Sequence, residues 1–187
     1  PLQASFLYCP HNMGRFTLAL SAIMVVSMLT ACGGGSKSGS LDLSEVKDTV
    51  AEAGVSVKVS SNNELTSAVR AVASVLKQNN TFDSQTAIDE IQKRITTKPG
   101  SNVIETATAI VLSDAEIRAG DDGSEYGLGF INTPEGVAAG VIIMMDRLVS
   151  ASGYTGDIMY SASATTVEAD NGTLYWVIGV KVTVDMN

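Results

Sequence analysis

Hydrophobic residues follow three patterns along the chain: an unbroken run over residues 16–28, helical spacing through the middle, and two-residue alternation near the end. Spacings of three and four predict helices over residues 41–50, 61–79, 84–98 and 133–149. Ser61 and Glu64 predict a capping box at the start of the second helix, and Thr133 followed by Pro134 marks the start of the last. The last helix is so apolar that it predicts burial on most sides.

The chain ends in a predicted β-hairpin. Apolar residues alternate over residues 158–164 and 174–184, on either side of the turn Asp170-Asn171-Gly172. Trp176 lies on the apolar face and is predicted to be a core residue, with a ligand site as the alternative, whereas Lys181 falls on the opposite face. A shorter alternation of Val55, Val57 and Val59 predicts an earlier strand.

Residues 102–119 suit either a helix or a strand, and we favour a helix, with Ser113 capping a separate turn through Glu116. Helices followed by a terminal hairpin, with one early strand, predict an α+β fold. The expected architecture is a two-layer or α-β-α sandwich, in which helices pack on a small, mostly antiparallel sheet.

The unbroken apolar run has the features of a secretory signal peptide. Met13-Gly14-Arg15 supplies a charged start, residues 16–28 supply the apolar segment, and small residues follow at Leu29-Thr30-Ala31-Cys32. A membrane-spanning helix needs about 20 apolar residues, so this run is too short to be one. The alternative to a specialised signal is an ordinary signal peptide with a chance cysteine.

Leu29-Thr30-Ala31-Cys32 resembles the lipobox of bacterial lipoprotein precursors. The resemblance implies that signal peptidase II recognises Leu29, Thr30 and Ala31 and cleaves before Cys32. It also implies a diacylglyceryl group on the Cys32 thiol and an acylated amino terminus, which together give the two acyl anchors that stable membrane attachment requires. Gly33 stands where an aspartate favours the inner membrane, so the resemblance favours the periplasmic or surface face of the outer membrane.

These features divide the chain into four parts. Residues 1–12 are predicted to be a non-native upstream extension, because Met13 is a natural start, and residues 13–31 are the signal peptide. Residues 32–40 form the lipidated cysteine and a flexible Gly/Ser tether. Residues 41–187 are long enough for a single α+β domain with a real core.

Composition narrows the chemistry of the mature chain, which starts at Cys32. Without Arg15, eleven Lys and Arg face twenty Asp and Glu, a net charge of −9, which disfavours nucleic acid as a partner. The only histidine, His11, lies in the upstream extension. The mature chain therefore has no Ser-His-Asp or Cys-His catalysis and no histidine metal site, and we predict no cofactor.

The most loop-like stretch, residues 120–129, is also acidic. Asp121, Asp122 and Glu125 offer oxygen ligands of the kind that calcium takes, but their spacing is not that of an EF-hand, and a solvated turn is the favoured interpretation. The same three carboxylates, near Tyr126, are the candidates for a glycan hydrolase that works with carboxylates alone.

A second resemblance begins at Thr133-Pro134-Glu135 and continues through Ser152-Gly153-Tyr154, Asp157-Ile158-Met159 and the strand Gly172-Thr173-Leu174-Tyr175-Trp176-Val177. These motifs resemble the C-terminal half of bacterial CAP (SCP-like) secreted domains, which implies an α-β-α sandwich. The family's helix is several residues shorter, its histidine is Tyr154 here, and the partner histidine is missing. The family's metal cleft therefore does not carry over.

Three classes of function remain: a non-catalytic binding module, a carboxylate-based hydrolase of envelope glycan, and an accessory subunit of a larger envelope assembly. We favour a membrane-anchored envelope lipoprotein that acts as a non-catalytic binding or accessory module, because nothing in the mature sequence organises a nucleophile, a base or a metal. Its predicted partners are the lipid bilayer, through acylated Cys32, and an envelope protein or glycan.

Overall fold

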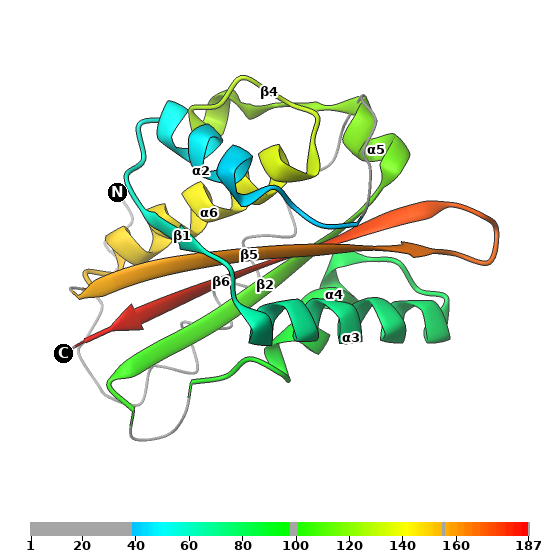
Figure 1. Ribbon diagram of the computed structural model, residues 1–187, viewed down its shortest axis with the longest axis horizontal. Helices are drawn as coiled ribbons and strands as arrows, with labels where there is room; N and C mark the ends of the chain where they lie inside the picture. The colour runs from blue at the N-terminus through cyan, green and yellow to red at the C-terminus, as the bar shows by residue number, and fades with distance from the viewer. Residues whose placement is uncertain (1–38, 98–100, 155, 187) are drawn as a thin grey trace, which may run out of the picture.

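A four-stranded sheet lies between two layers of helices in the computed structural model, which describes residues 39–97, 101–154 and 156–186 (Figure 1). The strand order is β1-β5-β6-β2. Strand β6 pairs antiparallel with both β5 and β2, and β1 pairs parallel with β5. The strands are β1 (Lys58–Ser60), β2 (Val103–Ser113), β5 (Asp157–Glu168) and β6 (Leu174–Asp185).

Each face of the sheet has its own pair of covering helices. One face carries α2 (Leu43–Glu52) and α6 (Pro134–Ala151), and the other carries α3 (Asn63–Asn79) and α4 (Ser84–Gln92). Shorter elements complete the first layer: α5 (Asp114–Ala119), β3 (Asp121–Asp122), the 3₁₀ helix η2 (Gly123–Tyr126) and β4 (Phe130–Ile131). The predicted α+β fold is therefore confirmed, with three layers.

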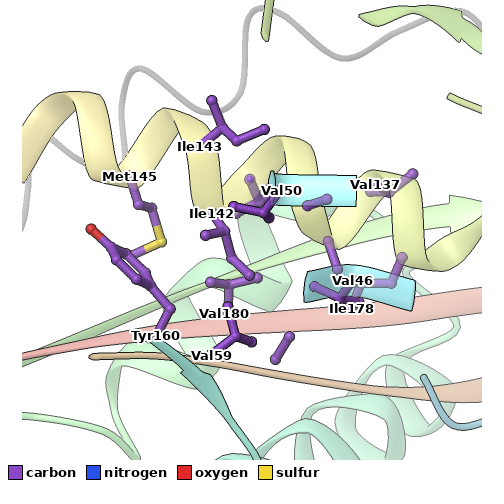
Figure 2. Close-up of a cluster of buried hydrophobic side chains, with 14 of the residues drawn as sticks. Val46, Val50, Val59, Val137, Ile142, Ile143, Met145, Tyr160, Ile178 and Val180 are labelled. Carbon is purple, nitrogen blue, oxygen red and sulfur yellow. The ribbon is translucent and has the colours of Figure 1, made fainter. Parts of the chain in front are cut away.

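Two hydrophobic cores result from the alternation of side chains along the strands. Tyr160, Ile178 and Val180 face α2 and α6, where Figure 2 shows them beside Val46 and Met145. Val177 and its same-face neighbours pack against α3 and α4 in the second core. Trp176 belongs to the first core and is 2% exposed, which confirms its predicted burial.

Residues 103–113 form strand β2 instead of the helix that we favoured, so that prediction is wrong. All eleven residues of β2 pair with β6, from Val103 opposite Asp185 to Ser113 opposite Tyr175. The apolar spacing of these residues is compatible with a helix or a strand, and pairing with β6 favours the strand. The separate turn is confirmed as α5, whose start has a capping box made by Ser113 and Glu116.

Three boundaries also differ from the prediction. The N-cap of α3 is Asn62, whose side chain accepts a hydrogen bond from the Leu65 N–H, so the predicted capping box of Ser61 and Glu64 is wrong. Helix α4 ends at Gln92, several residues earlier than expected. Strand β1 covers only Lys58–Ser60 of the predicted alternation. The predicted hairpin and the start of α6 at Pro134, capped by Thr133, are confirmed.

Candidate functional site

The predicted lipidation site lies outside the described residues. Leu29, Thr30, Ala31 and Cys32 all precede Gly39, where the description begins. Gly39 itself contacts the sheet, because a Cβ atom added there would lie 2.8 Å from both the backbone nitrogen and the Oγ1 of Thr166 in β5. The predicted tether therefore reaches the domain at this strand, immediately before α2.

The acidic stretch at residues 120–129 is more ordered than a solvated turn. Asp122 caps η2 by accepting a hydrogen bond of 3.0 Å from the Ser124 N–H. Strands β3 and β4 pair antiparallel, with Asp122 opposite Phe130. A Cβ atom at Gly123 would lie 2.4 Å from the Gly129 carbonyl oxygen, so the segment closes tightly on itself at a position that only glycine fits.

The three predicted carboxylates lie in this segment, but no metal cluster includes them. Within residues 39–97, 101–154 and 156–186, no group of three or more His, Cys, Asp or Glu side chains is arranged to hold a metal ion. Asp122 and Glu125 are exposed and Asp121 is half-buried.

Tyr126 is the most buried polar group of this segment, with 3% of its surface exposed. Its hydroxyl lies near the Glu125 carboxylate but makes no well-formed hydrogen bond among the residues that the structure describes. Burial, followed by the nearby carboxylates of Glu125 and Asp121, raises its pKa far above the ordinary value. Arg147 on α6 donates a hydrogen bond of 2.6 Å to the Glu125 carbonyl oxygen. The Tyr126 hydroxyl therefore stays protonated at neutral pH.

More carboxylates gather where α2 meets the start of α6. The Glu135 carboxylate accepts a hydrogen bond of 3.0 Å from the Asp42 N–H. Hydrogen bonds from Ser44 lower the pKa of Asp42, whereas partial burial and repulsion by Glu135 and Asp42 raise the pKa of Glu45. Sequence reasoning missed this second acidic group, because Glu135 is 93 positions from Asp42.

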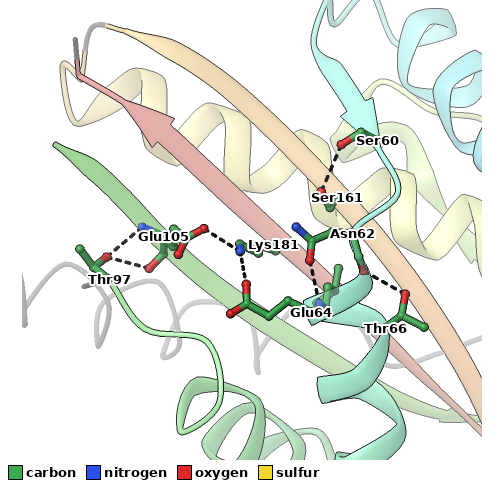
Figure 3. Close-up of polar contacts among 9 residues, drawn as sticks. Ser60, Asn62, Glu64, Thr66, Thr97, Glu105, Ser161 and Lys181 are labelled. Atoms are coloured by element: carbon green, nitrogen blue, oxygen red, sulfur yellow. Dashed lines mark hydrogen bonds and ion pairs between the residues drawn. The ribbon is translucent and has the colours of Figure 1, made fainter. Parts of the chain in front are cut away.

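A buried charge cluster on the other face of the sheet was also not predicted (Figure 3). Lys181 in β6 is 2% exposed, and its ammonium lies 2.7 Å from the carboxylate oxygens of both Glu64 and Glu105. The Thr97 hydroxyl donates to the Glu105 carbonyl oxygen and accepts from the Glu105 N–H. Desolvation lowers the pKa of Lys181, but the bonds to Glu105 and Glu64 outweigh it and raise the pKa overall. Lys181 is therefore a charged structural anchor and not a general base.

Trp176 has a structural partner of its own. Its indole N–H donates to the Asp114 carboxylate at 3.4 Å, so the start of α5 is linked to the central strand. This bond satisfies the polar atom of a buried side chain. The sequence signal for it was weak, because it joins residues 62 positions apart.

Comparison with known proteins yields no relative. No protein-family model matches the chain, and no match is found among curated proteins or solved structures. The resemblances to lipoprotein precursors and to CAP domains therefore stay predictions. Of the helices in the described part of the chain, none is both long and apolar enough to cross a membrane.

Proposed function

We propose that the protein is a lipid-anchored lipoprotein of a bacterial envelope and that its domain is a non-catalytic binding or accessory module. The observation that carries the proposal is the order of four sequence features: a charged start, an apolar run, Leu29-Thr30-Ala31-Cys32, and a Gly/Ser tether. The tether leads directly to Gly39 and α2, so an acylated Cys32 holds the domain close to a bilayer. We propose the outer membrane, because Gly33 follows the cysteine.

The acidic side chains of the domain support a binding role over a catalytic one. The Asp122 carboxylate caps η2 by accepting a hydrogen bond from the Ser124 N–H. Glu64 and Glu105 neutralise Lys181. Phe130, in contrast, leaves 64% of its surface exposed. An exposed aromatic side chain is typical of contact surfaces.

The lipid anchor is tested by replacing the acylated residue. Cys32→Ser removes the only thiol that the acyl transfer can use, so we expect the variant to remain an unprocessed, unacylated precursor. The measurement is intact mass of the membrane-extracted protein, which for the parent chain should begin at Cys32 and include acyl chains. Ser36→Ala, a control within the predicted tether, should still be processed and acylated and should stay attached to the membrane. Normal processing of the Cys32→Ser protein, or an unmodified parent mass, would contradict the anchor.

A further inference from the structure

The negative charge of the domain is concentrated in one of its two helical layers. The layer formed by residues 39–57 and 114–154 contains eleven Asp and Glu against three Lys and Arg, a net charge of −8. The layer formed by residues 61–97 contains four of each, a net charge of zero. Solubility alone requires no such separation, since acidic residues on either layer serve it equally.

Ion pairs hold half of the charged residues of the neutral layer, whereas the acidic layer has a single ion pair among the described residues, between Arg118 and Asp114. On α4, Glu90 forms ion pairs with Lys93 and Arg94, and Glu64 on α3 forms one with Lys181. In the acidic layer, Asp42, Glu45 and Glu135 crowd together. Repulsion between these carboxylates destabilises the isolated domain, and a cationic partner would relieve it.

Phe130 lies beside one of the carboxylates of the acidic layer, that of Asp122. It is the most exposed large hydrophobic residue among those described, and it sits opposite Asp122 in the β3–β4 pair, so their side chains share one side of the ribbon. Helix α2 touches the neighbouring segments at both of its ends, so they form one surface. Gly127, directly after η2, approaches Ala53 at the end of α2, and the Asp42 N–H at the start of α2 donates a hydrogen bond to Glu135 of α6. We call the surface of α2, the β3–η2–β4 segment and the first turn of α6 the acidic face; Figure 1 shows it on the side away from α3 and α4.

A buried group beneath the acidic face gives independent support. The Tyr126 hydroxyl lies near the carboxylates of Glu125 and Asp121, yet it makes no well-formed hydrogen bond within the described residues. A buried hydroxyl in this state is destabilising. The isolated domain therefore leaves the hydrogen bonding beneath this face incomplete.

We propose that the acidic face is the docking surface for a Lys- and Arg-rich protein surface, with Phe130 as its apolar anchor. Cationic side chains complement the carboxylates of this face, and the exposed Phe130 beside Asp122 offers an apolar contact next to a charged one. A bilayer is the poorer partner, because anionic headgroups repel this face. The inference deepens the proposed binding role but does not depend on the acylation of Cys32.

The test places a photo-crosslinking amino acid, p-benzoylphenylalanine, at position 130 of the full chain in its native envelope. We expect one protein adduct whose crosslinked peptide is rich in Lys and Arg. The same amino acid at Leu174, which is 39% exposed at the hairpin, should not give that adduct. Adduct yield should fall about fivefold or more in Asp122→Asn/Glu125→Gln and in about 0.5 M NaCl.

A charge-matched variant is the control. Glu168→Gln/Asp170→Asn also removes two exposed carboxylates, but from the hairpin, and should leave the yield within about twofold. Asn is as good an N-cap as Asp, so Asp122→Asn leaves the start of η2 intact. Equal loss in both double variants, an acidic or neutral crosslinked peptide, only lipid adducts, or no adduct would each overturn the inference. An unacylated protein that still gives the charge-dependent adduct would contradict the anchor alone, and an acylated protein without the adduct would contradict the docking surface alone.

Discussion

Lys181 in β6 forms an ion pair with Glu64 in α3 and so links this helix to the sheet. Its side chain crosses the layer between β6 and α3, and it is almost fully removed from water. Burying a single charge is costly unless other charges pair with it, and here Glu64 and Glu105 both do so. The three residues therefore act as one unit, and loss of any member changes the state of the others.

We predict that Lys181→Met lowers the free energy of unfolding by about 1–3 kcal/mol, because it leaves the Glu105 carboxylate without a cation in a largely buried place. Urea unfolding at neutral pH measures the change. Glu64→Gln is the matched control and should cost less, because the Glu64 side chain is 54% exposed and water replaces its partner. A Lys181→Met protein as stable as the parent would contradict this role.

The cluster also has a pH signature with a definite sign. Because the pKa of Lys181 is raised in the folded state, the stability it contributes is fully present below its unfolded pKa. That contribution disappears as the pH rises through the raised value. Lys181→Met should therefore remove this part of the alkaline loss of stability.

At the scale of elements, Gly179 sets how closely α3 approaches β6. A Cβ atom there would lie 2.4 Å from the Val69 side chain and 3.1 Å from that of Ile91. Both helices of this layer therefore meet the centre of the sheet at a position without a side chain. We predict that Gly179→Ala lowers the free energy of unfolding by about 1–3 kcal/mol through overpacking.

Thermal unfolding measures this effect, and Gly129→Ala serves as the control. A Cβ atom at Gly129 meets nothing within 4 Å, so that variant should melt close to the parent. Equal melting temperatures for the two variants would show that α3 can shift away from β6 without loss.

Much of this element pattern followed from the sequence. The helices α3 and α6 and the β5–β6 hairpin were predicted because apolar periodicity and caps agree there. Strand β2 was missed because its apolar residues fit both periods, and only its partner β6, far along the chain, selects the strand. The cap of α3 was missed by one position, because Ser61 and Asn62 are both good capping residues.

The candidate site was only partly predictable. Sequence placed Asp121, Asp122 and Glu125 together, since they are close in the chain. It did not place Asp42 beside Glu135, nor Glu64 beside Lys181, because these contacts join residues 93 and 117 positions apart. Long-range contacts of this kind depend on how the layers stack, which local periodicity does not encode.

At the scale of the whole molecule, the uneven charge makes the domain a marked electrostatic dipole. The acidic layer carries the charge of −8, and Glu135 and Asp42 repel Glu45 where α2 meets the start of α6. Salt screens repulsion between exposed charges over a Debye length of about 10 Å at 0.1 M. We therefore expect the melting temperature to rise by a few degrees between about 0.02 and about 0.5 M NaCl.

The double variants separate this effect from general salt stabilisation. The rise should be smaller in Asp122→Asn/Glu125→Gln than in Glu168→Gln/Asp170→Asn, because only the first pair lies in the acidic layer. The pKa of Glu45 leads to a related expectation. Because this pKa is raised, the folded protein binds the Glu45 proton more tightly than the unfolded chain does, so stability should increase as the pH falls through that pKa and the carboxylate loses its charge. A melting temperature that falls with salt would contradict the repulsion.

The parallel pair of β1 and β5 has a consequence for the order in which the domain folds. Ser60 and Ser161 face each other across this pair although 101 positions separate them. In a chain that emerges from its N-terminal end, α2 and β1 appear first and have no partners until α6 and β5 have followed. The layer of α2 and α6 and the parallel pair therefore close only after most of the chain is available, so these contacts form late.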